Sequence, residues 1–175
     1  MLEALKRDRD RYRAATGRAF PLGFWVGATY RLGAWARSLP WFPGILFRVL
    51  RRLLEIPWHL CLNVEIYAER IEPGLVLIHP HSIIIGPGVE IGRDCLVFHE
   101  VTIGANAWRV GVPRLGDRVD VYAGARVLGD VAIGNESMIG ANCVITRDVP
   151  AGSVVMLPPA ATLPRHLLDR RPAVR

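Results

Sequence analysis

Three histidines are the side chains in this sequence whose type and spacing could support chemistry near neutral pH. His79 and His81 lie in the segment GLVLIHPHSIIIG, and His99 lies in VFHEVT. His79 and His99 each follow an aliphatic residue, Leu77 or Val97, by two places. An imidazole titrates near neutral pH and can act as a general base. We therefore take His79 as the candidate base, with His99 as its neighbour.

The element that must position these histidines is a six-residue repeat, interrupted once, that runs from Ile85 to Pro150. Each unit opens with an aliphatic residue, and a small or β-branched residue follows four places later. A parallel β-helix that turns a corner every six residues explains this period, whereas a helix or an ordinary half-buried strand does not. The sequence therefore predicts a mainly β fold. The opening residues are Ile85, Ile91, Val97, Ile103, Leu115, Val121, Val127, Ile133, Ile139 and Ile145.

This repeat resembles the hexapeptide repeat of left-handed β-helix acyltransferases. The resemblance implies that three units form one triangular coil and that coils stack about 4.8 Å apart. Leu77 and Val97 are then separated by one coil plus two inserted residues. We therefore expect His79 and His99 to lie one above the other on the same face.

The interruption of the repeat predicts a loop at residues 107–114. Trp108-Arg-Val-Gly-Val-Pro-Arg114 replaces the unit that the period requires. Gly111 and Pro113 indicate a segment that leaves the coil. Because loops on rigid scaffolds often carry binding residues, we expect this loop to border the site.

Composition limits the partners of the chain. With 175 residues, it is long enough for one domain with a helical appendage. The 22 Lys and Arg residues outnumber the 16 Asp and Glu residues, so an anionic partner such as coenzyme A, a membrane surface or nucleic acid is expected. Nucleic acid is the least favoured, since the basic residues are scattered. Cys95 and Cys143 occupy small-residue positions, which predicts buried apolar thiols and a reducing, cytoplasmic setting.

The segment before the repeat is predicted to be helical. Its prolines divide it into about three helices, roughly 2–16, 22–38 and 44–56. The charged N-terminus does not resemble a signal peptide, and arginines keep every uncharged run below the ~20 residues of a spanning helix. We expect the helices to pack on one another and on the first coils. Contact with a membrane surface is an alternative that we do not favour.

The helical segment makes the resemblance more specific, because it resembles that of the serine acetyltransferases. It carries Arg7-Asp-Arg-Asp10 and then Gly23-Phe-Trp-Val-Gly-Ala-Thr-Tyr-Arg-Leu-Gly-Ala-Trp35. The match continues through the His79 segment, through VTIG at residues 101–104 and into the last coils, while the family's long additional N-terminal helical domain is missing. The resemblance implies transfer of an acetyl group from acetyl-CoA, the acyl donor, to the hydroxyl of a small acceptor, with no metal.

The resemblance also implies roles for residues around the acceptor. His79 matches the general base that takes the proton of the attacking hydroxyl. Glu65 lies near the position of the acid that holds this imidazole, one residue closer in sequence than usual. Asp10 matches a carboxylate that contacts an amino-acid acceptor.

Five further residues match positions that serve the acyl donor. The backbone N–H groups at Gly104 and Ala105 are the implied oxyanion donors. Ala123 and Ala141 match small residues along which the pantetheine arm lies. Arg147 matches a basic residue near the coenzyme phosphates.

Departures from the family pattern concern the acceptor. Ile78 replaces the acid that precedes the base, and Gly111-Val112 replaces an Arg-His pair. His99 could stand in for the missing imidazole, and Arg109 or Arg114 for the missing cation. Serine or a serine-like amino acid, favoured by Asp10, therefore competes with a sugar hydroxyl of polysaccharide or natural-product biosynthesis.

Two further alternatives stay open. The chain could be an inactive β-helix scaffold, which would lose nothing on replacement of His79. His79, His81 and His99 could instead form a metal site, and activity that survives a chelator would count against that.

The expected organisation has three parts. Residues 1–62 form a helical region, residues 63–157 the β-helix with its loop at 107–114, and residues 158–175 a C-terminal tail. The resemblance implies a homotrimer, since the family's acyl-donor groove forms between subunits. The sequence ends at residues 173–175 without the family's acidic tail, so no complex with cysteine synthase is expected.

Overall fold

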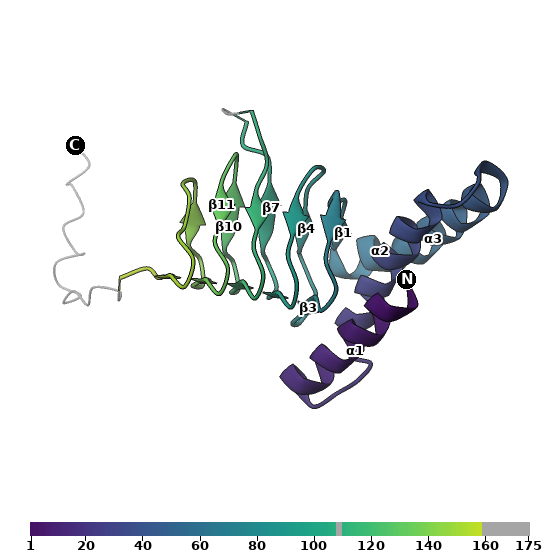
Figure 1. Ribbon diagram of the computed structural model, residues 1–175, viewed down its shortest axis with the longest axis horizontal. Helices are drawn as coiled ribbons and strands as arrows, with labels where there is room; N and C mark the ends of the chain where they lie inside the picture. Colours follow the sequence, from purple (N-terminus) through teal and green to yellow (C-terminus); the bar gives the residue numbers. More distant parts are fainter. Residues whose placement is uncertain (108–109, 159–175) are drawn as a thin grey trace, which may run out of the picture.

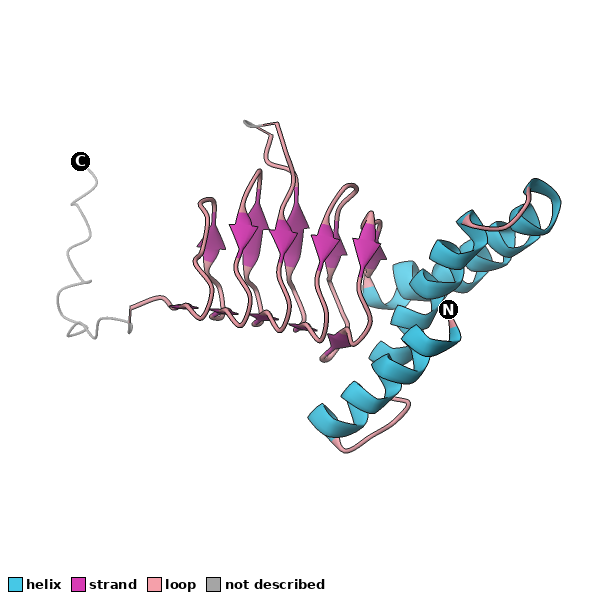
Figure 2. Cartoon of the chain, viewed as in Figure 1, coloured by secondary structure: helices cyan, strands magenta, loops and turns pink. Residues whose placement is uncertain are grey.

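The chain forms a β-helix with three α-helices at its N-terminal end (Figures 1 and 2). This computed structural model describes residues 1–107 and 110–158. The predicted site residue Arg109 and residues 159–175 of the predicted tail lie outside the described residues. The elements are α1 (Leu2–Thr16), α2 (Leu22–Arg37), α3 (Trp41–Leu62), β1 (Glu65–Ile66), β2 (Arg70–Ile71), β3 (Val76–Leu77), β4 (Ile84–Ile85), β5 (Glu90–Ile91), β6 (Leu96–Val97), β7 (Thr102–Gly104), β8 (Arg114–Leu115), β9 (Asp120–Val121), β10 (Arg126–Leu128), β11 (Ala132–Ile133), β12 (Met138–Ile139), β13 (Val144–Ile145) and β14 (Val154–Val155).

The short strands form three parallel sheets, one for each side of the coil. Their orders are β1-β4-β7-β10-β13, β11-β8-β5-β2 and β14-β12-β9-β6-β3. Apart from the pair β12 and β14, each strand pairs with the third strand after it, as in Ile85 with Ile103 and Val127 with Ile145. Each of these pairs is 18 residues apart, which is three units of six. The predicted mainly β fold of stacked hexapeptide coils, preceded by short helices, is confirmed.

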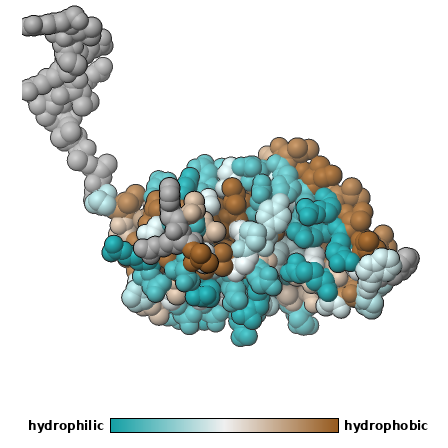
Figure 3. Space-filling view, turned by 90° about the horizontal axis from the view of Figure 1, so that it is seen from above, coloured by the Kyte–Doolittle hydropathy of each residue, from teal (hydrophilic) through white to brown (hydrophobic). Residues whose placement is uncertain are grey.

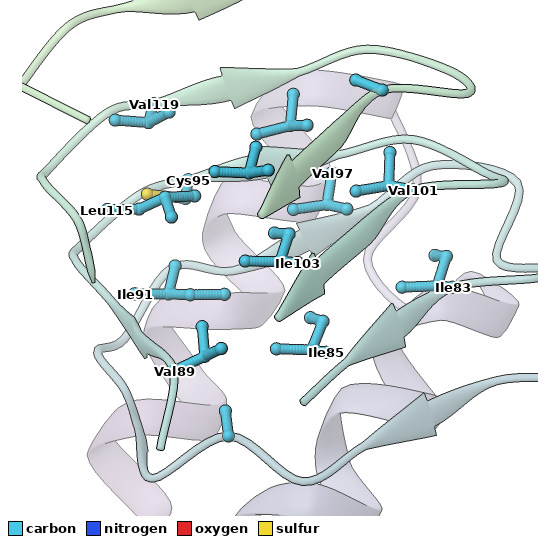
Figure 4. Close-up of a cluster of buried hydrophobic side chains, with 14 of the residues drawn as sticks. Ile83, Ile85, Val89, Ile91, Cys95, Val97, Val101, Ile103, Leu115 and Val119 are labelled. Atoms are coloured by element: carbon cyan, nitrogen blue, oxygen red, sulfur yellow. The ribbon is translucent and has the colours of Figure 1, made fainter. Parts of the chain in front are cut away.

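The interior of the coil is filled by the two positions that repeat every six residues (Figure 4). Ile85 and Ile91 open their units, Val89 and Cys95 follow four places later, and all four are buried. Cys95 and Cys143 are both buried, as predicted. Burial of this aliphatic column, at about 25 cal/mol per Å² of apolar surface, is the main force that holds the coils together.

The interruption of the repeat forms a loop between β7 and β8, which rises above the sheets in Figure 1. Ile103 and Val127 pair across neighbouring coils although they are 24 residues apart, six more than in an uninterrupted coil. Gly111 has φ 122°, and a Cβ there would collide with Asp130, so this position requires glycine. The side chain of Val112 packs against the core.

Helix α3 is longer than the sequence predicted. It begins at Trp41 rather than near residue 44, and it continues through Pro57 to Leu62 instead of ending before the proline. Proline removes one helical hydrogen bond. Packing of α3 on α2, including an edge-to-face contact of Trp35 and Phe47 at 4.9 Å between ring centroids, outweighs that loss. Within residues 1–107 and 110–158, no helix is both long and apolar enough to cross a membrane.

Candidate functional site

One corner of the β-helix carries the candidate chemistry. Strand pairing aligns Leu77, Val97, Val121 and Ile139 on four successive coils. The residues two places later therefore share one corner, and they form what we call the corner column. The column consists of His79, His99, Ala123 and Ala141.

The histidines of the corner column form a cluster with His81. The ring centroids of His79 and His99 are 6.2 Å apart in an edge-to-face arrangement, and the pairing of Leu77 with Val97 confirms that the two residues lie one above the other. The ring of His81 stacks on that of His99 at 4.8 Å and 24°. The Nδ1 atom of His99 is buried and has no hydrogen-bond partner among the described residues. An unpartnered buried nitrogen is costly, and at an active site it is a group that a ligand could satisfy.

The cluster also bears on the metal alternative. Ligand atoms of His81, His99 and Glu100 lie within 4.8 Å of one another, and two of these residues are exposed. The metal site considered from the sequence differs from this group, because it contained His79 in place of Glu100. Such partly exposed groups are common on protein surfaces, so this arrangement does not by itself indicate a metal.

A pocket of about 640 Å³ opens beside His79. Its walls come from the turn after β3, from the end of α1 and from the start of α2. Arg18 is the only Lys, Arg, Asp or Glu residue that lines it within the described part of the chain, and the rest of the lining is mostly apolar. The lining residues are Tyr12, Thr16, Arg18, Pro21, Leu22, Gly23, Leu62, Leu77, Ile78, His79, Pro80 and His81.

Tyr12 of α1 fixes the strand that leads into His79. Strand β3 is the edge strand of its sheet, so the N–H and C=O of Leu77 point away from β6. The Leu77 N–H donates to the Tyr12 hydroxyl oxygen at 2.6 Å, and that hydroxyl lies 3.4 Å from the Leu77 carbonyl oxygen. Burial raises the pKa of Tyr12, so its hydroxyl stays protonated and can donate. Gly23 allows this contact, since a Cβ there would collide with Leu77 and Tyr12.

A buried ion pair fixes the preceding corner of the first coil. Both side chains of the Asp8–Arg31 pair are buried, and Arg31 Nε lies 3.0 Å from the Asp8 carboxylate. Arg31 also donates to the carbonyl oxygens of Ile71 and Glu72, and the Gly74 N–H donates to Asp8 at 2.6 Å. Charged partners thus satisfy backbone groups that would otherwise be buried without hydrogen bonds.

Sequence analysis missed Asp8, Tyr12 and Arg31. Asp8 and Tyr12 are four residues apart and share one helix face, which is the signal that could have suggested a joint contact. Only the packing of α1 across β3 shows what they bind.

Three residues predicted near the acceptor have other partners in the structure. Glu65 is not brought to His79 by any described hydrogen bond or ion pair, and its carboxylate lies 3.9 Å from His59 Nδ1. Asp10 pairs with its neighbour Arg9 and does not line the pocket. Arg114 pairs with Asp130 at 3.1 Å, and both side chains are exposed.

Of the residues predicted to serve the donor, Ala123 and Ala141 lie on the corner column, whereas Gly104, Ala105 and Arg147 lie at another corner, at or after the ends of strands β7 and β13 of a different sheet. Gly104 is buried in β7, and its carbonyl accepts from the Gly129 N–H at 2.9 Å, while Ala105 is exposed. The Ala123 carbonyl accepts from the Asn142 N–H at 2.9 Å, which joins the two coils whose corner carries Ala123 and Ala141. Arg147 is exposed at a later corner.

Comparisons with known proteins find hexapeptide-repeat proteins, in agreement with the fold. Residues 130–155 match the family described as the hexapeptide repeat of succinyl-transferase. A serine acetyltransferase of Helicobacter pylori is 39% identical over 104 residues, which cover 58% of this chain and 61% of that protein. One of Mycobacterium tuberculosis is 35% identical over 130 residues, covering 73% of this chain and 54% of that protein. The chain thus spans little more than half the length of these relatives.

A solved structure shows the same architecture. The structure of serine acetyltransferase 1 of Entamoeba histolytica in complex with L-cysteine superposes with a TM-score of 0.71 at 26% identity. The superposition covers 89% of this chain and 62% of that one. The helices and the coils therefore match together, since neither part alone accounts for that share of the chain.

Proposed function

Because this chain belongs to the serine acetyltransferase family of hexapeptide-repeat proteins, we propose that it transfers the acetyl group of acetyl-CoA to a hydroxyl group. The observation that carries the proposal is the corner column, in which two histidines are continued by two alanines beside a pocket. A base and a smooth groove for a thioester arm are what such a transfer needs.

The donor lies along the alanine half of the corner column. Coils stack at about 4.8 Å, so Ala141 is about 14 Å from the His79 coil, a span that an extended pantetheine arm covers. Side chains larger than Ala123 and Ala141 would block the arm. Arg147, which is exposed after β13, would meet the coenzyme phosphates, and N–H groups at Gly104 and Ala105 are the proposed oxyanion donors.

The reaction uses His79 as a general base. Its neutral imidazole takes the proton of the acceptor hydroxyl while the oxygen attacks the thioester carbonyl carbon. The tetrahedral intermediate then collapses, the C–S bond breaks, and the imidazolium returns the proton to the coenzyme A thiolate. An acetyl ester and free coenzyme A result, so atoms and charge balance. His99 would bind the acceptor through its Nδ1, which has no hydrogen-bond partner among the described residues.

That Glu65 orients the imidazole of His79 stays a prediction. Its carboxylate would have to leave His59, from which it is 3.9 Å away, and turn toward His79. Both side chains of the Glu65–His59 pair are about one-third exposed, so this pair contributes little and its loss costs little.

The proposed acceptor is serine or a serine-like amino acid. The size of the pocket gives a reason to test larger acceptors as well. Pockets of about 300 to 1,000 Å³ hold drug-sized ligands, and this one measures about 640 Å³. Ile78 lines it where the family resemblance implies an acid. A sugar hydroxyl is therefore the second candidate.

The assembly proposed with this function is a homotrimer in the cytoplasm, with coils wound left-handed as the family resemblance implies. A single described chain presents the corner column on its surface, and a neighbouring subunit would supply the second wall of the donor groove. The residue divisions 1–62, 63–157 and 158–175 belong to the same proposal.

An acceptor panel tests this function. The purified protein is incubated with acetyl-CoA and with L-serine, other hydroxylated amino acids or sugars, and the acetylated product is identified by mass spectrometry. We expect one of these classes to yield an O-acetyl ester. Tight coenzyme binding without product from any acceptor would reject the proposal.

A further inference from the structure

The outer face of α3 is apolar along its length and is not covered by any other residue that the structure describes. Successive residues of a helix are rotated by about 100°, so the half of α3 that faces away from α2 can be read from the sequence. Within that half, described side chains are aliphatic apart from two prolines and Cys61. Leu46 is 66% exposed, Leu53 58% and Leu60 82%. We call this half the outer face, and its central exposed residues are Ile45, Leu46, Val49, Leu53, Ile56 and Leu60.

Figure 3 shows hydrophobic residues gathered over the helical end of the molecule, whereas the β-helix surface is mixed. A surface helix normally hides its apolar stripe in the core. Here the core-facing side of α3 carries Phe47, Arg51 and Trp58 instead, and the aliphatic side faces solvent. An exposed apolar patch of this extent marks an interaction site.

Charge selects the partner. Exposed Arg48 and Arg52 lie along one border of the outer face, next to the exposed ring of Trp41. Among the described residues, neither arginine forms an ion pair. The only acidic residue of α3, Glu55, is partly buried and already pairs with Arg51 at 2.6 Å. A cationic and aromatic border beside an aliphatic face matches the interface of an anionic bilayer.

The same observations disfavour a second copy of this chain. A face roughly 180° wide is broader than the stripe that a helix pair buries. Pairing two copies would also bring the arginine borders together, and α3 has no free carboxylate to compensate them. Lipid has neither problem, because acyl chains cover the whole face and phosphates meet the border.

We propose that α3 binds anionic phospholipid membranes by lying in the plane of the interface, with the outer face toward the acyl chains. Its 22 residues span about 33 Å, and an interfacial helix buries its apolar side about 5–10 Å deep. The β-helix then extends from the membrane surface into water. Membrane contact was not favoured from the sequence alone. The hydrophobic side chains between residues 20 and 62 could equally have formed a buried packing face.

Flotation with vesicles tests the proposal on the full chain. Vesicles of phosphatidylcholine alone are compared with vesicles that contain about one-third phosphatidylglycerol. We expect wild-type protein to float with the anionic vesicles and much less with the neutral ones. The double variant Leu46→Glu/Leu53→Glu should reduce binding by about tenfold or more, since each glutamate places a charge in the apolar layer.

Three further variants separate the effect of charge from that of shape. Arg48→Glu/Arg52→Glu should weaken binding to anionic vesicles by about tenfold or more, whereas Arg48→Lys/Arg52→Lys should preserve it. Val110→Glu places one glutamate at a 99% exposed apolar residue away from α3, and it should bind like wild type. Thermal unfolding of each variant checks that the fold is kept.

Three results would overturn the proposal. Wild-type protein could fail to float with anionic vesicles, or Leu46→Glu/Leu53→Glu could float as well as wild type. The same double variant could instead halve the molecular mass of the protein in solution without any vesicle binding by wild type, which would show that a second copy covers the outer face. Acetyl transfer is measured separately and does not depend on these outcomes.

Discussion

His79 and His99 share a corner of the β-helix but differ in their surroundings. His79 is exposed and lines the pocket, whereas His99 is partly buried and its Nδ1 has no hydrogen-bond partner in the part of the chain that the structure describes. A base must reach the hydroxyl that it deprotonates, which favours His79 for that task. His99 is better placed to hold a ligand than to exchange protons with solvent. His81, stacked on His99, adds a third imidazole that the repeat does not require.

The three cysteines should differ in reactivity. Burial raises the pKa of the Cys95 thiol to about 11, and Cys143 is buried as well, while Cys61 is exposed on α3. The thiolate is the reactive form, so Cys95 stays unreactive near pH 7. We expect a disulfide reagent to label one thiol per folded chain and three after denaturation. Rapid labelling of two or more thiols in the folded protein would contradict the packing of the coil interior.

At the scale of elements, the first coil depends on α1 and α2 to close its open edge. Edge strands expose unpaired backbone groups, and here Tyr12, Asp8 and Arg31 satisfy those of the first coil. The same contacts set the position of the turn that carries His79. The helices therefore act as positioning elements for the candidate base.

Replacing Tyr12 by Phe tests this positioning. The variant leaves the buried Leu77 N–H without its acceptor, which should cost about 1–3 kcal/mol of unfolding free energy. We also expect a lower kcat with little change in the KM for acetyl-CoA, because the turn at His79 loosens while the alanine half of the corner column is untouched. Tyr67→Phe, at an exposed tyrosine, is the control and should change neither quantity. Equal behaviour of the two variants would refute the role of Tyr12.

Docking of α1 should weaken in acid. Arg7 donates two hydrogen bonds to Asp94, at 3.0 and 2.6 Å, and these hold the pKa of Asp94 below its ordinary value. A carboxyl whose pKa is lower in the folded state stabilises fully above the unfolded pKa of about 3.9, and this stabilisation is lost as pH falls toward the folded pKa. Asp94→Asn should therefore lower Tm at pH 7, and the difference from wild type should shrink below about pH 4.

The exposed pair Arg114–Asp130 supplies the control for this pH series. Both of its side chains are more than half exposed, so Asp130→Asn should leave Tm nearly unchanged at every pH. A constant difference between Asp94→Asn and wild type from pH 7 to pH 3 would show that the Asp94 charge is not what binds α1.

The coils could be predicted from the sequence much better than the helices. Each unit buries the same two positions, so a local period fixes both the strand register and the position of His79 directly beside His99 on the next coil. The predicted end of α3 was wrong, because a proline such as Pro57 ends a helix only where packing does not compensate the lost hydrogen bond. The partners of Glu65 and Asp10 depend on side-chain packing between elements, which no period encodes.

In the whole molecule, we expect the loop between β7 and β8 to be separable from the coil that it interrupts, although its Val112 packs against the core. It adds six residues to an 18-residue coil, as the pairs Ile103–Val127 and Val127–Ile145 show. Deletion of residues 108–113 should restore the uninterrupted spacing. We expect cooperative unfolding and acetyl-CoA binding to persist, with loss of transfer to the acceptor. Loss of the folded state would show instead that the loop, through Val112, is part of the core.

The two ends of the molecule have different proposed roles. The coils carry the corner column. The helices carry the side chains that hold the first coil, such as Tyr12, and the outer face of α3. Membrane binding would hold the pocket, which lies between helices and coils, close to a lipid surface. A hydroxylated acceptor at that surface would then be within reach.

Release of free thiol from acetyl-CoA shows directly whether His79 is the general base. It is made with wild type, with His79→Ala and with His79→Gln, in the presence of the acceptor that the panel identifies. Loss of a general base should lower kcat by about 10²- to 10⁴-fold, with unchanged binding of coenzyme A and unchanged Tm. Acceptor-dependent thiol release that survives both substitutions at full rate would contradict the assignment of His79 as the base.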